Sequence, residues 1–256
     1  DLSLSSNFAW GQILFCYLLN QWGSTPGGIL SAFLVMALSC TLFGCLNGLV
    51  VVLGGIPPFI ATLGMMTIIR GISLLFTGGQ MIATDNEFIK AFGKGSFLGV
   101  SYLTYVFAAV VLIAFFVMRY TRYGRALYAT GGNPQTAQLS GIPVRWSRFS
   151  VFAILGFCAG LAAAMFVSLM RAGSVLYGTD LALTCVAATV IGGTPLTGGE
   201  GSVPRTALGI LLIFVVYKGL AFLGLQGYYN TMIRGVILLA VVAGNAYVVS
   251  SKRRAA

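Results

Sequence analysis

The sequence predicts an all-α fold, a polytopic transmembrane helix bundle. Only 8% of the 256 residues are charged, against about a quarter in a soluble domain. Four stretches contain no charge at all, and each is about as long as, or longer than, the roughly 20 residues that cross a bilayer as a helix. They are Leu2–Ile69, Gly95–Met118, Phe149–Met170 and Gly235–Ser251. A very apolar soluble core is disfavoured, because these runs leave almost no polar face to cover them.

About eight apolar segments follow one another along the chain. They are Phe8–Trp22, Ile29–Leu53, Phe59–Phe76, Tyr102–Met118, Phe149–Met170, Leu181–Ile191, Ala207–Leu225 and Tyr229–Ser250. The first and sixth are short and interrupted by polar residues, so they fit half-spans or broken helices. The number of spans is therefore defined to within one or two.

The distribution of basic residues predicts the orientation. The connection 119–148 has five arginines and no acid, which is typical of cytoplasmic loops. These are Arg119, Arg122, Arg125, Arg145 and Arg148. Four apolar segments separate this loop from the basic tail Lys252–Arg254, so both should be cytoplasmic. The loop Thr77–Lys94, one span away and carrying Asp85 and Glu87, should face outward. The same positions argue against a nucleic-acid partner.

Three short motifs recur in the same order. Asp1–Leu4 is similar to Asp180–Leu183, Leu46–Leu49 to Tyr217–Leu220, and Thr67–Ile72 to Thr231–Val236. We therefore expect one transmembrane domain over residues 1–256, containing two duplicated halves with approximate repeats at 1–76 and 180–250. Duplicated transporters place the solute path where the repeats meet.

The basic loop contains the signals of a short capped helix. Asn133 is a favourable N-cap, and Pro134 suits the first helical position, where its missing N–H has no cost. Gly141 can adopt the left-handed conformation that ends a helix. We expect a helix at Pro134–Ser140 between two glycine-rich hinges, and we favour a docking element over an ordinary connector.

Several kinds of chemistry are disfavoured. The glycine-rich stretches Gly93–Gly95 and Gly192–Gly201 lack the Gly-Lys-Ser/Thr ending of a phosphate loop. The chain has no histidine, no paired carboxylates and no metal-ligand spacing, so we expect no catalytic set, no metal and no cofactor. The five cysteines lie inside apolar runs and are expected to serve in packing. They are Cys16, Cys40, Cys45, Cys158 and Cys185.

Three charged residues lie within or near the ends of apolar segments, where charge is costly. Arg70, Lys218 and Arg234 either contribute to a solute path or an interface between repeats, or they snorkel or pair structurally. Asn47, Phe59 and Thr62 complete the candidates for this path. No acid or histidine lies in the middle of a long span, which disfavours coupling to protons.

Motifs distributed over essentially the whole chain resemble those of ribose-type ABC permeases, the monosaccharide branch of the branched-chain permease family. The matching motifs are Ile56–Met65, Arg70-Gly71, Tyr123–Arg125, Gly131–Asn133, Ala137, Leu139–Ile142, Gly192–Thr194, Leu196 and Gly198–Gly201.

This resemblance implies a permease subunit of an ATP-driven importer in the bacterial cytoplasmic membrane. It implies three partners besides membrane lipid: a nucleotide-binding ATPase that holds ATP and magnesium, a second permease copy or paralogue, and a periplasmic or lipid-anchored solute-binding protein. It also implies that Gly124–Ile142 is the loop that couples to the ATPase. The coupling residues would be Gly124, Arg125, Gly131, Gly132, Asn133, Pro134, Ala137, Leu139 and Gly141.

The resemblance also implies about ten spans, so we expect roughly two more before Asp1. The chain departs from the family at Ser5-Ser6-Asn7, where a small residue and a glycine are usual. Other solutes remain open: a polyol, a sugar-like signal or a branched-chain amino acid. An ion-coupled secondary transporter is less favoured, and a membrane-embedded enzyme or scaffold is disfavoured because no catalytic set is visible.

Overall fold

The fold is known from a computed structural model, which describes residues 1–224 and residues 229, 232–233, 235–236, 239 and 243. The chain forms two compact units. Unit 1 consists of Asp1–Ala109 and Arg145–Ala182, and unit 2 consists of Val110–Val144 and Leu183–Ala256. The expected first repeat, 1–76, lies wholly in unit 1.

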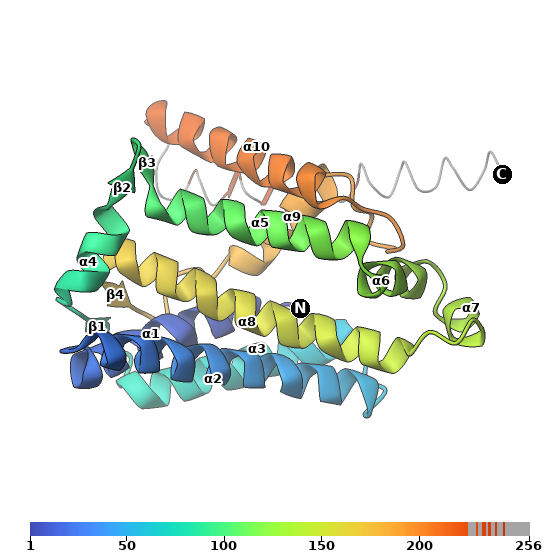
Figure 1. Cartoon of the computed structure of the whole chain (residues 1–256), viewed down its shortest axis with the longest axis horizontal. Coiled ribbons are helices and arrows are strands. Elements are labelled where there is room, and N and C mark those ends of the chain that lie inside the picture. Colours follow the sequence, from blue (N-terminus) through green and yellow to red (C-terminus); the bar gives the residue numbers. More distant parts are fainter. Residues whose placement is uncertain (225–228, 230–231, 234, 237–238, 240–242, 244–256) are drawn as a thin grey trace. The chain divides into compact units, whose positions relative to one another are not determined.

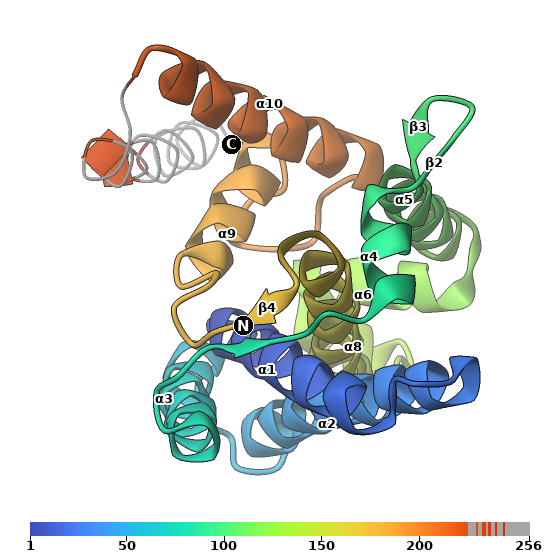
Figure 2. The same ribbon diagram turned by 90° about the vertical axis from the view of Figure 1, so that its left-hand side faces the viewer.

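Unit 1 is a bundle of long helices closed at one end by short strands (Figures 1 and 2). Its elements are α1 (Leu4–Trp22), α2 (Pro26–Val52), α3 (Pro58–Thr77), β1 (Ile82–Ala83), α4 (Glu87–Lys94), β2 (Ser96–Phe97), β3 (Val100–Ser101), the start of α5 (Tyr102–Tyr120), α8 (Val144–Met170) from Arg145, and β4 (Ala172–Gly173). β1 pairs antiparallel with β4, and β2 pairs antiparallel with β3.

Unit 2 contains the basic connection and a helical hairpin. Its elements are the remainder of α5, α6 (Arg122–Gly132), α7 (Pro134–Leu139), most of α9 (Leu181–Ile191) and α10 (Val203–Phe222). The hairpin of α9 and α10 has its own small core, with Ala187, Ala188 and Ile213 buried against one another.

The core of unit 1 is built around α1. Thirteen of its 19 residues are buried, and Figure 2 shows it between α2, α3 and α8. The helix carries Ser5, Ser6, Asn7 and Gln12 in buried positions. A helix this polar would be poorly stable against lipid, and the surrounding protein meets part of its need for hydrogen bonds: the Asn7 side-chain nitrogen donates to the Cys40 carbonyl oxygen, and Ser5 Oγ accepts from the Ala182 N–H, each at 3.0 Å. The central position of α1 therefore shields its polar side chains from lipid.

Helices α2 and α8 approach each other through two pairs of glycines. Gly44 and Gly48 lie one turn apart on α2, and Gly156 and Gly160 lie one turn apart on α8. A Cβ atom at Gly156 would be 2.5 Å from the carbonyl oxygen of Cys40, which leaves no room for a side chain. These two small-xxx-small motifs allow the close backbone contact that holds helices together in membranes.

Five helices among the described residues are long and apolar enough to cross a membrane: α2, α3, α5, α8 and α10. The helical, polytopic membrane fold is confirmed. Each of the first seven predicted segments contains a helix, but α1 is too polar for this group and α9, at 11 residues, is only about 16 Å long. The eighth segment lies largely outside the described residues. The total of about eight spans thus stays a prediction.

Candidate functional site

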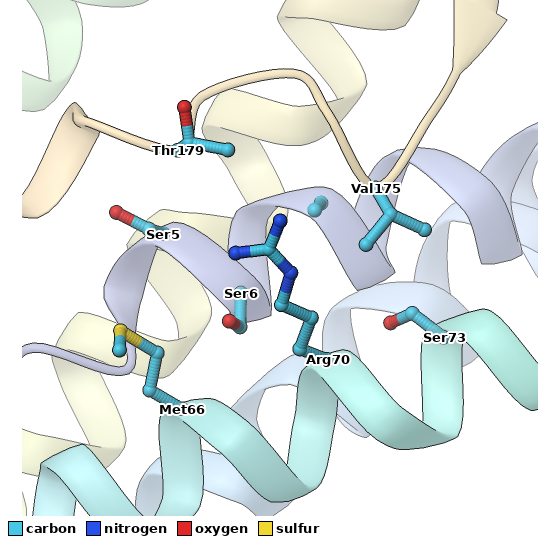
Figure 3. Close-up of a pocket in the computed structure, with 8 residues that line it drawn as sticks. Ser5, Ser6, Met66, Arg70, Ser73, Val175 and Thr179 are labelled. Atoms are coloured by element: carbon cyan, nitrogen blue, oxygen red, sulfur yellow. The ribbon is translucent and has the colours of Figure 1, made fainter. Parts of the chain in front are cut away.

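A small pocket lined largely by polar residues lies in unit 1, between α1, α3 and the segment that follows β4, and two of its lining residues, Arg70 and Thr179, are exposed (Figure 3). Its volume is about 20 Å³, which is room for roughly one water molecule. It is lined by Ser5, Ser6, Ala9, Met66, Arg70, Ser73, Val175 and Thr179. Three serine hydroxyls, a threonine and a guanidinium therefore converge in an otherwise apolar bundle.

The periodicity of α3 directs Arg70 into this pocket. Met66, Arg70 and Ser73 are four and three residues apart, so they share one face of the helix. Figure 3 shows the Arg70 guanidinium pointing from α3 into the space beside Ser5 and Ser6. No acid lines the pocket, and no ion pair of Arg70 is present among the described residues.

The electrostatics of the pocket are positive. Ser5 and Ser6 belong to the first turn of α1, where free backbone N–H groups give a helix its positive end. The Arg70 guanidinium adds a full charge and five N–H donors. The pocket can therefore donate hydrogen bonds to hydroxyl or carboxylate oxygens of a small solute, while the serines can both donate and accept.

Two of the predicted path residues, Asn47 and Thr62, hold the start of α1 in place. The Asn47 side-chain amide donates to Asp1 Oδ2 at 3.0 Å and to Ser3 Oγ at 2.7 Å. The Leu2 backbone N–H donates to Thr62 Oγ1 at 3.1 Å. Both side chains are about 1% exposed. Their position makes them supports for the helix that lines the pocket, and neither lines the pocket itself.

Two other predicted path residues, Phe59 and Lys218, do not line this pocket. Phe59 is 64% exposed on α3, and Lys218 is exposed on α10 in the other unit. Arg234 lies outside the described residues. In unit 1, sequence analysis missed the lining residues Ser5, Ser6 and Ser73. Polar residues within the charge-free Leu2–Ile69 stretch and just beyond it were the signal that could have identified them.

Several buried polar atoms of α1 and α2 have no hydrogen-bond partner among the residues that the structure describes. Gln12 is fully buried with neither its amide oxygen nor its nitrogen bonded, and Asn7 Oδ1 and Asn47 Oδ1 are likewise unpaired. Unpaired buried polar atoms are costly, so such groups are typically retained where water or a ligand bonds them in some state.

The second predicted element, the capped helix of the basic loop, is present in unit 2. Asn133 Oδ1 accepts the N–H groups of Gln135 and Thr136, each at 3.0 Å, and Pro134 is the first helical residue. Gly141 has a φ of 81°, which is the expected left-handed ending. The helix α7 ends at Leu139, one residue before the expected boundary.

The expected hinge at Gly131 and Gly132 is wrong. Both residues form the end of α6, whose last turn packs against Gly198 and Gly199. The glycine pair lets the backbone of α6 contact a turn that is distant in the sequence. All five arginines of the loop are helical: Arg119 belongs to α5, Arg122 and Arg125 to α6, and Arg145 and Arg148 to α8.

The predicted coupling residues divide by exposure. Leu139 is 90% exposed and Arg125 is exposed, so both are free to contact a partner. Ala137 and Gly124 are buried and serve packing within unit 2. Among the described residues, no group of three or more Cys, Asp or Glu side chains is placed to hold a metal ion.

Comparison with known proteins identifies relatives over nearly the whole chain. Residues 1–242 match the family described as branched-chain amino acid transport system / permease component. The chain is 35% identical to the ribose import permease protein of Haemophilus influenzae over 222 residues, which cover 85% of this chain and 69% of that protein. It is 36% identical to the ribose import permease protein of Escherichia coli K12 over 207 residues, covering 79% of this chain and 64% of that protein.

The L-arabinose ABC transporter permease protein of Azospirillum brasilense is 31% identical over 247 residues, 96% of this chain and 72% of that protein. The chain thus spans between 64% and 72% of the length of these three relatives. No solved structure matches the chain.

Proposed function

Because the chain belongs to the family of branched-chain amino acid transport system permease components, we propose that it is the membrane-spanning permease subunit of an ATP-driven importer for a monosaccharide. The observation that carries the proposal is the Arg70 pocket, where two serines of the buried helix α1 lie beside Arg70 and Ser73 of α3 in a membrane bundle. The names of the relatives, ribose and L-arabinose permeases, favour a sugar as the solute.

The Arg70 pocket suits a polyhydroxylated solute. Sugar hydroxyls both donate and accept hydrogen bonds, which matches the serine hydroxyls and the guanidinium. At about 20 Å³ the pocket holds a water and not a sugar, so passage requires α1 and α3 to separate. In this proposal the pocket is part of a closed path, and the unpaired Oδ1 of Asn7 and side-chain amide of Gln12 are available to form hydrogen bonds in the open path.

The energy for opening comes from a separate ATPase that binds ATP and magnesium and contacts α7. The double cap of α7 and its exposed Leu139 support this docking role. A solute-binding protein would deliver the sugar from the outer face, and a second permease copy or paralogue would complete the path.

The orientation in the bacterial cytoplasmic membrane is supported by α8. Its first turns carry Arg145 and Arg148, and its 27 residues make it about 40 Å long. At its other end β4 pairs with β1, and Arg171 lies 3.9 Å from Asp85. The loop with Asp85 and Glu87 and the arginine-bearing end of α8 are therefore about a bilayer apart, which agrees with a cytoplasmic location of these arginines.

We also propose that α1 and α9 are equivalent helices of two duplicated halves. α1 begins three residues after Asp1, and α9 begins directly after Asp180. Each is a short or polar helix followed by a long apolar one. The Ala182 backbone N–H donates to Ser5 Oγ at 3.0 Å, so the starts of the two helices are in contact within unit 1. We infer that the solute path lies where these two helix starts meet.

Uptake by reconstituted protein tests the proposal. The permease is incorporated in liposomes with its proposed partners, an ATPase and a solute-binding protein from the same organism. Radiolabelled D-ribose, L-arabinose, D-allose and L-leucine are offered with and without ATP inside the vesicles. We expect uptake of at least one sugar that requires ATP and the ATPase. Uptake that continues without ATP and follows an ion gradient would instead indicate a secondary transporter. Uptake of leucine alone would show that the transported solute is an amino acid and not a sugar.

A further inference from the structure

The glycine-rich turn between α9 and α10 contacts the helix that precedes α7, although the two are about 70 residues apart in sequence. A Cβ atom at Gly131 would lie 2.7 Å from the Gly199 backbone nitrogen, and one at Gly199 would lie 2.7 Å from the Gly132 Cα. Non-bonded carbon atoms prefer about 3.5 to 4.0 Å. The two backbones thus meet without any intervening side chain. We name Gly131, Gly132, Gly198 and Gly199 the glycine seam.

The turn on the other side of the seam requires glycine for its own conformation. Gly198 and Gly199 both have a φ of 82°, in the left-handed region that side chains rarely adopt. A hydrogen bond also joins the turn to α6, one helical turn before the glycines: the Tyr128 hydroxyl donates to the Gly201 carbonyl oxygen at 3.1 Å. The seam is therefore anchored at two points on α6, one turn apart.

The two helices that this turn joins, α9 and α10, form a tightly packed hairpin. A Cβ atom at Gly192 would lie 2.6 Å from the Thr206 Cα, so the start of α10 lies directly against the end of α9. Gly209 approaches the Ala188 carbonyl oxygen equally closely. The buried core of Ala187, Ala188 and Ile213 joins the two helices further along. A displacement of the turn must therefore move the hairpin as one body.

From this arrangement we propose that the glycine seam is the mechanical link through which α6 and α7 move the α9–α10 hairpin. A contact made by long side chains can absorb a small displacement by rotamer changes, whereas a backbone-to-backbone contact cannot. Tyr128, Gly131 and Gly199 are positioning residues, which act through α10. The inference rests on the proposed coupling of α7 to an ATPase, and it assigns the Gly192–Gly201 segment a role in that coupling.

Gly132, which neighbours Gly131 in the glycine seam, provides a matched control for substitution of Gly131. A Cβ atom at Gly132 would lie 3.9 Å from the Gly199 Cα, an ordinary van der Waals distance, whereas one at Gly131 clashes. Both residues are in the last turn of α6, so alanine changes the helix propensity equally at each. Gly131→Ala must push the turn away from α6, and Gly132→Ala leaves it in place. Tyr128→Phe removes only the hydroxyl that bonds Gly201.

The experiment measures uptake and ATP hydrolysis in the same proteoliposomes, with the full-length permease, its ATPase and its binding protein. The probe is whichever of D-ribose, L-arabinose and D-allose the wild type takes up. For Gly131→Ala we expect the ATPase to co-purify and its basal hydrolysis to stay within about twofold, while sugar moved per ATP falls at least about fivefold. Tyr128→Phe should lower the same ratio about two- to tenfold, and Gly132→Ala should match the wild type.

Equal sugar-to-ATP ratios for Gly131→Ala and Gly132→Ala would overturn the link. So would uptake and hydrolysis that fall in proportion, since that pattern means fewer assembled complexes and a purely structural role. If Gly131→Ala is not produced, the ratio for Tyr128→Phe decides. Failure of the proposed function is distinguishable, because in that case the wild type itself shows neither ATP-dependent uptake nor co-purification with the ATPase.

Discussion

At the scale of single residues, polar side chains inside the bundle divide into supports and candidates for solute contact. Thr62 and Asn47 bond the backbone and side chains at the start of α1 and are sealed from the surface. Arg70 points into a pocket with no carboxylate opposite it. The two groups predict different consequences of mutation, one for stability and one for transport.

Thr62→Val should destabilise the protein by about 1–3 kcal/mol, because the Leu2 N–H loses its buried acceptor while the side-chain shape is kept. Thr67→Val is the matched control on the same helix, since Thr67 is exposed and bonds only the Gly64 carbonyl one turn away. Its effect should stay within about 0.5 kcal/mol. Thermal unfolding in detergent compares the two. Equal unfolding midpoints would show that Thr62 does not hold α1.

Arg70→Gln should lower sugar uptake at least about tenfold, because removal of a charged hydrogen-bond donor costs about 1.5–3 kcal/mol. Arg70→Lys should recover part of the uptake, since it keeps the charge and loses the planar fork of donors. Met66→Leu, a volume-conserving change in the same pocket, is the control and should transport normally. Normal uptake by Arg70→Gln at normal expression would place the solute path elsewhere.

At the scale of elements, the short helix α7 owes its stability to its caps. It has only six residues, too few to be stable alone, and only Ala137 in it is buried. The cap of Asn133 and the left-handed Gly141 therefore account for much of its order. Changes at its two ends should affect coupling without disturbing membrane insertion of the bundle.

Asn133→Ala should cost about 1 kcal/mol of local helix stability, because two backbone N–H groups lose their shared acceptor. Asn133→Asp keeps the acceptor and is the control. At equal expression, Asn133→Ala should lower solute-stimulated ATP hydrolysis and uptake in proteoliposomes, and Asn133→Asp should retain both. If the two variants behave alike, the cap is not what orders α7 for docking.

Gly141→Val should be more severe than loss of the cap, because a β-branched residue resists a φ of 81°. No atom lies within 4 Å of a Cβ at this position, so the cost is conformational and not steric. Gly141→Asn, which tolerates the left-handed region, should be milder. Uptake and expression are measured together for the pair. Normal uptake by Gly141→Val would show that the loop only connects α5 and α8 and does not couple to the ATPase.

At the scale of the whole molecule, the orientation in the membrane can be tested directly. Cysteines at Gln135 and at Glu87 are introduced singly into a chain lacking the native cysteines. A membrane-impermeant maleimide should label Glu87→Cys in intact cells, because the Glu87 side chain is 79% exposed in the loop Thr77–Lys94, which is expected to face outward. It should label Gln135→Cys only after permeabilisation. Labelling of Gln135→Cys from outside would reverse the proposed orientation.

The sequence by itself determined the fold class, the seven described helix-forming segments and the capped α7. These features depend on local chemistry: runs without charge, cap residues and glycines at helix ends. The family followed from motifs that can be read along the chain. The orientation also follows from the sequence, through the arginines near the ends of the spans, and it stays a prediction.

Only the tertiary structure decided which polar residues meet and what the glycines do. Arg70 and Ser5 are 65 positions apart, and nothing local indicates that they line one pocket. Gly131 and Gly132 suggested a hinge, because a glycine looks the same in sequence whether it bends a chain or admits a neighbour. The distinction depends on Gly198 and Gly199, which only the packing of unit 2 brings into contact with α6. Long-range contacts of this kind leave no periodic signal in the sequence.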